Sequence, residues 1–234
     1  MASGAQAQTQ SPAATSPQAA AEERLHNDWP WLARYREANA ADVALPAARR
    51  RVVFMGDSIT QGWFDKRPAF FTDNGFLGRG IGGQTTAQML ARFWPDVIAL
   101  KPEAVHILAG TNDIAGNTGP YDPQATCDNL QAMAALARAN GVRVILGALT
   151  PAARYPWRPA LHPDQEIPRL NAWIAAFARR QGHGLADYPA AMDDGQAAMK
   201  PGLAYDGVHP TLEGYGVMEP LALAAIARTL KHRA

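Results

Sequence analysis

The sequence predicts an α/β protein, a three-layer α/β/α sandwich built on a five-stranded parallel sheet. From Arg51 onward, short β-branched or apolar runs alternate with glycine-containing turns and amphipathic helical patterns, an order typical of parallel sheets. Right-handed crossovers between such strands place helices on both faces. The chain has 234 residues, 47% of them hydrophobic, and this is enough for one sizeable core but not comfortably for two.

The expected strands lie at 52–55, 76–79, 104–108, 142–146 and 185–188. Helical patterns lie at 85–100, 123–140, 166–181 and about 211–230. In such a sheet, ligands bind outside the carboxyl ends of the strands, where the strand order reverses. The polar and glycine positions that follow the strands should therefore share one rim.

Residues 22–234 are expected to form a single domain that begins with a helix at about 22–41. Its apolar stripe, formed by Leu25, Trp29, Leu32 and Tyr35, predicts packing against the body. Residues 1–21 are rich in Ala, Gln, Ser and Pro, and we expect a disordered tail. The small-residue segment at 5–7 resembles the end of a removed signal peptide, which favours an exported protein, periplasmic or secreted; a cytoplasmic protein is the alternative.

Composition narrows the classes of partner. The formal net charge is only +1, and no block of Lys and Arg is interleaved with aromatics, so nucleic acid and anionic membrane surfaces are poor candidates. No apolar stretch is long enough to span a membrane, and no Cys or His spacing suggests a metal. The single cysteine, Cys127, has the helical spacing of a small buried hydrophobe. Nothing in the sequence indicates an oligomeric state.

Ser58 is a candidate nucleophile because Gly56-Asp57-Ser58 ends an apolar strand and opens the next helix. A hydroxyl at a helix N-terminus lies in a field that favours developing negative charge. The alternative is that Ser58 is only the helix N-cap. Thr60 stands where the second glycine of Gly-x-Ser-x-Gly would be, which disfavours an ordinary α/β-hydrolase nucleophile elbow.

Asp206 and His209 form a candidate acid and base pair just before the last helix. A carboxylate on one ring nitrogen fixes the tautomer and leaves the other nitrogen to accept the proton of a serine. The plain alternative is a turn aspartate and a surface histidine. His106, within a strand, is expected to be a core residue.

Two further segments could supply donors to an oxyanion. The turn Gly80-Ile81-Gly82-Gly83 lets backbone amides approach a ligand closely, although it could equally be a plain strand-to-helix turn. The amide of Asn112 follows the third strand as a neutral donor, with a helix cap or an Asn turn as the alternative.

Together, Gly56-Asp57-Ser58, Gly82-Gly83-Gln84-Thr85, Gly110-Thr111-Asn112-Asp113 and Asp206-Gly207-Val208-His209-Pro210 resemble the signature blocks of the SGNH hydrolase superfamily, the GDSL esterases and lipases. The spacing looks most like platelet-activating-factor acetylhydrolase catalytic subunits and their bacterial relatives. The resemblance covers the chain from about Val52 to the last helix. It implies a flavodoxin-like fold and a serine ester hydrolase that needs no cofactor or metal.

The resemblance also implies a role for each matching residue. Ser58 would be the nucleophile, His209 the base and Asp206 its partner. The backbone amides of Ser58 and Gly83 and the side chain of Asn112 would form the oxyanion hole. Gln84 stands where many relatives carry an aspartate, which puts the local turn network in doubt, and Asp57 and Asp113 are better explained as anchors of their turns.

The expected substrate is a small-molecule or carbohydrate ester. Its acyl group should be short, with acetyl as the first candidate, because the sequence has no long apolar insertion that could form a lid. The loop at 151–163 is rich in proline and aromatics, and Tyr155 and Trp157 are candidates for contacting sugar or lipid; a stiff surface loop is the alternative. Hydrolysis of phospholipid or thioester acyl groups stays open. A catalytically silent binding module is another alternative. A third is a nucleotide-binding protein that uses Gly80–Gly83, although the sequence lacks the Gly-Lys-Ser/Thr phosphate loop.

Overall fold

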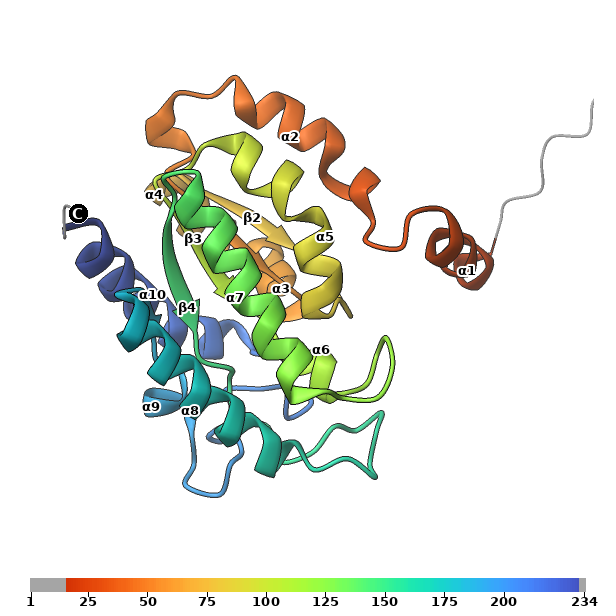
Figure 1. Ribbon diagram of the computed structural model, residues 1–234. Coiled ribbons are helices and arrows are strands. Elements are labelled where there is room, and N and C mark those ends of the chain that lie inside the picture. Colours follow the sequence, from red (N-terminus) through yellow and green to blue (C-terminus); the bar gives the residue numbers. More distant parts are fainter. Residues whose placement is uncertain (1–15, 232–234) are drawn as a thin grey trace, which may run out of the picture.

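The computed structural model describes residues 16–231 and has the three expected layers (Figure 1). All five strands are parallel, in the order β2-β1-β3-β4-β5. They are β1 (Val52–Gly56), β2 (Phe76–Gly80), β3 (Ala104–Leu108), β4 (Arg143–Gly147) and β5 (Gly184–Ala186). This confirms the fold class and all five predicted strands.

Helices cover both faces of the sheet (Figure 1). One face carries α5 (Thr86–Asp96), which continues into the 3-10 turn η3 (Ile98–Leu100), with α7 (Pro123–Ala139) and α8 (Pro163–Gln181). The other face carries α3 (Ser58–Lys66), α4 (Pro68–Asn74) and α10 (Leu212–Lys231). The short helices α4, α6 (Thr111–Ile114) and α9 (Pro189–Met192) were not predicted. No helix within residues 16–231 is both long and apolar enough to cross a membrane.

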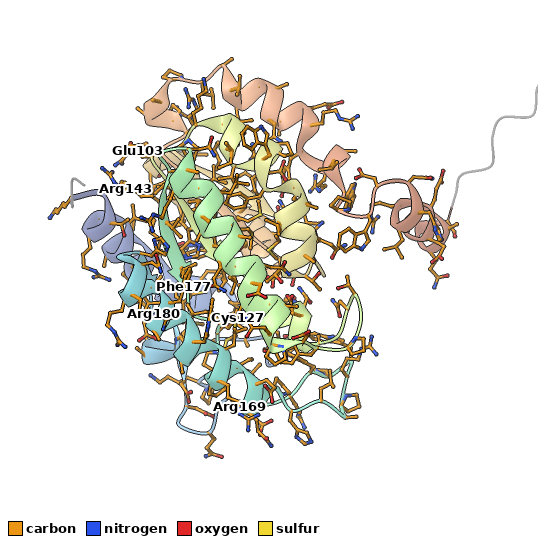
Figure 2. The ribbon with its side chains drawn as sticks, in the orientation of Figure 1. Glu103, Cys127, Arg143, Arg169, Phe177 and Arg180 are labelled. Carbon is orange, nitrogen blue, oxygen red and sulfur yellow. The ribbon has the colours of Figure 1, made fainter. Side chains whose placement is uncertain are left out.

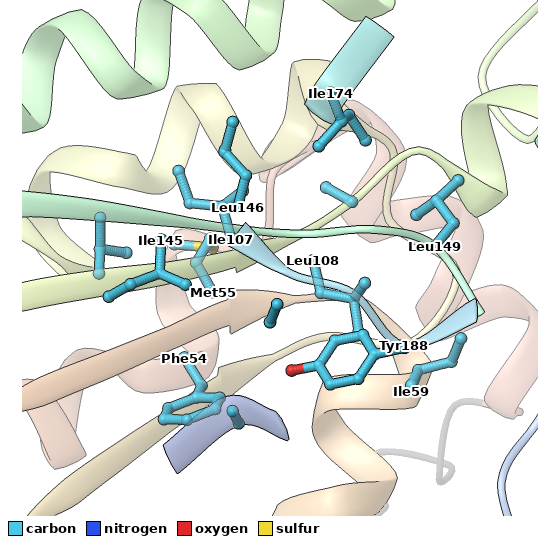
Figure 3. Packing of buried hydrophobic residues seen from close by; sticks show 14 of the residues in the cluster. Phe54, Met55, Ile59, Ile107, Leu108, Ile145, Leu146, Leu149, Ile174 and Tyr188 are labelled. Carbon is cyan, nitrogen blue, oxygen red and sulfur yellow. The ribbon is translucent and has the colours of Figure 1, made fainter. Parts of the chain in front are cut away.

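The core is continuous through the sheet because successive strand residues point to opposite faces. Figure 3 shows Phe54 and Tyr188 on one side and Leu146 and Ile174 on the other. His106 is fully buried in this core, where its Nε2 lies 2.8 Å from the hydroxyl of Tyr188. Burial lowers the pKa of His106 to about 3, so the ring is neutral and has a packing role, as predicted.

Cys127 lies on α7 (Figure 2) and is buried. Burial raises the pKa of its thiol, and the nearby Asp128 carboxylate adds to the shift. A thiol with a raised pKa is a poor nucleophile at neutral pH. Cys127 is therefore the small buried hydrophobe that its spacing predicts.

The N-terminal segment departs from the prediction of a tail that ends at residue 21. Residues 17–21 belong to α1 (Pro17–Asn27), because the Ser16 side chain accepts a hydrogen bond from the Ala19 amide and caps the helix. Residues 1–15 lie outside the described part of the chain. The segment at 5–7, on which the expectation of export rests, is among them.

The predicted single helix at 22–41 is also wrong, because the chain breaks at 28–31. The Asp28 carboxylate accepts bonds from the amides of Leu32 and Ala33 and starts η1 (Leu32–Tyr35), which leads into α2 (Arg36–Val43). The helix α1 projects away from the body (Figure 1), and Leu25 is 49% exposed. Of the predicted stripe, Tyr35 reaches the body and donates to the carbonyl of Gly80 at 2.5 Å.

A buried arginine ties α5 to the first strand. Arg92 is fully buried and donates to the Asp96 carboxylate at 2.9 Å, to the carbonyl of Gly56 at 3.0 Å and to the side-chain oxygen of Gln84 at 2.5 Å. Gly56 ends β1, two residues before Ser58. The network therefore fixes the backbone just ahead of the candidate nucleophile.

We predict that Arg92→Leu lowers the free energy of unfolding by about 3 kcal/mol or more, because it leaves Asp96 buried without its cation. Urea denaturation measures the change. The matched control is Arg169→Leu, since Arg169 pairs with Glu166 on the surface, and it should change stability by about 0.5 kcal/mol or less. Equal effects of the two variants would contradict the structural role of Arg92.

Candidate active site

Ser58 is the first residue of α3, directly after β1 and Asp57. Asp57 is the N-cap, since its carboxylate accepts a bond from the Ile59 amide at 2.9 Å. Ser58 is therefore not the N-cap, and its hydroxyl is available for another partner. Burial raises the pKa of Asp57 to about 6, although the hydrogen bond from the Ile59 amide lowers it. Asp57 is therefore a structural carboxyl in the core.

The sheet brings the two ends of the predicted catalytic set together. Ser58 Oγ lies 2.9 Å from His209 Nε2, across 151 residues of sequence. On the other side of the ring, His209 Nδ1 lies 2.7 Å from Asp206 Oδ2. A hydroxyl, an imidazole and a carboxylate thus form one continuous chain of hydrogen bonds, the arrangement by which a base activates a serine.

Asp206 is held in place by its own turn. Its Oδ1 accepts bonds from the backbone amides of Val208 and His209, at 2.9 and 2.8 Å. Burial alone would raise the pKa of Asp206, but the bonds from the backbone and ring of His209 and from the Val208 amide outweigh it and lower the pKa. The carboxylate is therefore ionised at neutral pH and can stabilise an imidazolium.

The two adjacent glycine amides in the turn after β2 are used differently. The Gly82 amide is taken by the side-chain oxygen of Gln61, at 2.8 Å. Gly83 has a left-handed backbone, with φ of +77°, and no acceptor within residues 16–231 takes its N–H. As the first residue of α3, Ser58 also has an N–H without a partner inside the helix.

Asn112 is buried and oriented by its neighbours. Its Nδ2 donates to the carbonyl of Gln84 at 3.1 Å, which uses one of two amide hydrogens. Its Oδ1 accepts from Nδ2 of Asn117 at 2.9 Å, and Asn117 also lies 2.9 Å from the carbonyl of Gly83. Asn117 therefore links two predicted oxyanion donors. The sequence prediction missed it, because it stands in a glycine-rich loop without periodicity.

Gln84 has a structural explanation. Its oxygen accepts from Arg92, and its Nε2 donates to the carbonyl of Pro30 at 2.8 Å. Asp96 already supplies the negative charge that pairs with Arg92. The neutral side chain of Gln84 can therefore bond both Arg92 and Pro30 without adding a second charge.

Asp113 anchors the turns at this rim, as predicted from the sequence. Its carboxylate accepts hydrogen bonds from the amide and the hydroxyl of Thr86 on α5.

The predicted loop residues have different surroundings. Tyr155 is 0% exposed, and its hydroxyl donates to the carbonyl of Thr111 at 3.1 Å. The expectation that Tyr155 contacts substrate is therefore wrong, because its ring is covered by the protein. Trp157 is 42% exposed and stacks on Tyr155, with ring centroids 5.3 Å apart. Its ring lies 5.8 Å from that of His209.

A cavity of about 540 Å³ opens beside these residues. It lies between the loop that follows Asn112 and the loop that carries Trp157. Its lining includes Ile114, Ala115, Pro120, Tyr121, Trp157 and Leu161. The wall is mainly apolar, so it suits the carbon skeleton of a substrate. Within residues 16–231, no group of three or more His, Cys, Asp or Glu side chains could hold a metal ion.

Residues 54–217 match the model of the GDSL-like lipase/acylhydrolase family. The chain belongs to this family. It is accordingly an ester hydrolase, and the matched segment contains every residue of the site described above. Comparison with curated proteins gives no match.

Solved structures agree with this assignment. A GDSL-like lipase from Bacteroides thetaiotaomicron is 44% identical over 86% of this chain and 99% of its own, with a TM-score of 0.81. A candidate acylhydrolase from Bacteroides fragilis is 47% identical over 87% of this chain and 99% of its own, with a TM-score of 0.82. An acetylxylan esterase from Geobacillus stearothermophilus shares the fold, with a TM-score of 0.58. It is 20% identical over 75% of this chain and 93% of its own.

We predict that Asn117→Ala lowers kcat of this GDSL hydrolase about tenfold and changes KM less than about threefold. The reason is that misplaced oxyanion donors weaken the transition state more than the bound substrate. Steady-state kinetics on nitrophenyl acetate give both constants. Asn140→Ala is the control, because the Asn140 side chain donates to the carbonyl of Leu136 on its own helix. A change confined to KM would contradict the positioning role of Asn117.

Proposed function

We propose that this protein cleaves short-chain acyl esters, acetyl esters above all, through an acyl-enzyme on Ser58. The observation that carries the proposal is the unbroken chain from Ser58 Oγ through the His209 ring to Asp206, at 2.9 and 2.7 Å. The amide hydrogens that we assign to the oxyanion are those of Ser58, Gly83 and Asn112, and Asn112 Nδ2 uses one of its two hydrogens on the carbonyl of Gln84.

In the proposed first step, Ser58 Oγ attacks the ester carbonyl carbon while His209 Nε2 takes the hydroxyl proton. Asp206 keeps its bond to Nδ1 and stabilises the imidazolium. The carbonyl oxygen becomes an oxyanion that accepts bonds from the amides of Ser58 and Gly83 and from Nδ2 of Asn112.

Collapse of this intermediate breaks the bond between the carbonyl carbon and the alcohol oxygen. His209 Nε2 returns the proton to the leaving alcohol, and the acyl group stays on Ser58. A water molecule that gives its proton to His209 then attacks the acyl-enzyme, and the same steps release the acid and restore the Ser58 hydroxyl.

The preference for a short acyl group has two supports. The two loops that border the cavity, 115–122 and 148–162, contain no helix or strand that could form a lid over Ser58. Structural neighbours that share the fold include acetylxylan esterases. A second candidate is hydrolysis of longer acyl groups in a lysophospholipid or thioester, and the apolar cavity beside Trp157 favours it.

We predict that Ser58→Ala abolishes hydrolysis of nitrophenyl acetate and labelling by a fluorophosphonate, while its thermal unfolding stays close to that of the unaltered protein. Loss of the nucleophile leaves at most a small residual rate from the oxyanion donors. Substantial turnover by the variant would remove Ser58 from the mechanism. Failure of the unaltered protein to react with the fluorophosphonate would instead indicate a silent binding module.

A chain-length series separates the two acyl candidates. We predict that kcat/KM on nitrophenyl esters is highest for acetate and falls steadily towards octanoate. A maximum at hexanoate or octanoate would replace the proposal with the second candidate, because the cavity would then bind the acyl chain.

A further inference from the structure

Two exposed aromatic rings lie next to the His209 ring. Trp157 comes from the loop between β4 and α8, and Tyr205 from the segment between β5 and α10. Their ring centroids are 5.8 and 5.6 Å from that of His209. Trp157 is 42% and Tyr205 64% exposed. Exposed rings at a reacting centre are available to pack against a bound molecule.

Both rings are held by the protein. Trp157 stacks at an interplanar angle of 15° on buried Tyr155, which is tied to the carbonyl of Thr111 beside Asn112. The ring of Tyr205 stacks at 16° on His209, and the Lys66 ammonium lies 4.5 Å from its centroid. Lys66 also donates to the carbonyl of Pro210, at 3.4 Å. A ring fixed before binding loses little conformational entropy on binding.

The reaction itself assigns these rings to one side of the substrate. His209 Nε2 delivers its proton to the leaving alcohol, so that oxygen must come within about 3 Å of Nε2. The acyl oxygen turns instead towards the donors at Gly83 and Asn112. Groups that flank the imidazole therefore contact the alcohol part of the ester.

We propose that Trp157 and Tyr205 bind the alcohol part of the substrate and that this alcohol is a carbohydrate ring. The inference rests on the proposed acyl-enzyme mechanism. A sugar ring presents apolar C–H groups on its faces, which pack on the electron-rich faces of aromatic rings, and hydroxyl groups around its edge. The protein surface at Trp157 and Tyr205 likewise combines apolar ring faces with polar donors.

Polar donors stand beside the apolar surfaces. Lys66 uses one of its three ammonium hydrogens on Pro210 and retains the others for a sugar hydroxyl. The phenol of Tyr205 and the guanidinium of Arg158, an exposed residue that lines the same cavity as Trp157, add further donors. A long alkyl alcohol could use the ring faces but offers these donors no acceptor in place of the water that it displaces, so the site favours a polyhydroxylated ring.

The test compares three acetate esters that share one acyl-enzyme and differ in the alcohol: xylose tetraacetate, ethyl acetate and dodecyl acetate. Released acetate gives kcat/KM for the unaltered protein and for Trp157→Leu and Tyr205→Leu. We expect each variant to lose at least about fivefold more on the sugar ester than on ethyl acetate, which matches the strength of an aromatic contact. Tyr205→Phe keeps the ring face and should lose less on the sugar ester than Tyr205→Leu.

The matched control is Trp94→Leu, which removes a 54% exposed tryptophan from α5 and should leave all three constants unchanged. Equal losses on the sugar ester and ethyl acetate would overturn the carbohydrate subsite. A higher kcat/KM of the unaltered protein on dodecyl acetate than on the sugar ester would also overturn it. Either result leaves the acyl-enzyme mechanism standing, whereas hydrolysis of ethyl acetate by Ser58→Ala would overturn that mechanism itself.

Discussion

Parallel strand pairing is the constraint on which the site depends. Because β1, β2 and β3 are adjacent and parallel, their carboxyl ends meet at one rim, and Ser58, Gly83 and Asn112 each follow one of these ends. The segment after β5 returns His209 to the same rim, where it bonds Ser58. No single segment contains the site, so the serine meets its base only where the sheet brings these strand ends together.

The fold and the proximity of Ser58, His209 and Asp206 could be predicted from sequence because both leave local patterns, whereas the oxyanion roles of Gly83 and Asn112 rest on the family resemblance. Alternating strands and helices predicted the sheet, and the strand ends predicted which residues share the rim. The spacing of Asp206 and His209 lets one turn bring the carboxylate to the ring. The N-cap alternative for Ser58 was settled by geometry, since Asp57 fills that position.

Other features depend on contacts that no local pattern records. Asn117 owes its position to Asn112 and the carbonyl of Gly83, and the loop around it has no regular period. Tyr155 is covered by neighbours distant in sequence, so its exposure could not be read from the loop composition. The break at Asp28 followed from a side chain that competes for backbone amides, against the helical spacing of the apolar residues.

The central claim is that Ser58 carries the acyl group between the two halves of the reaction. Mass analysis of the protein, acid-quenched during turnover of nitrophenyl acetate and digested, tests this most directly. The account predicts one added acetyl group on the peptide that contains Ser58, and none on that peptide in Ser58→Ala. An acetyl group trapped on another residue during turnover would contradict the account. So would the absence of any trapped acetyl group, if His209→Ala also turned over as fast as the unaltered protein.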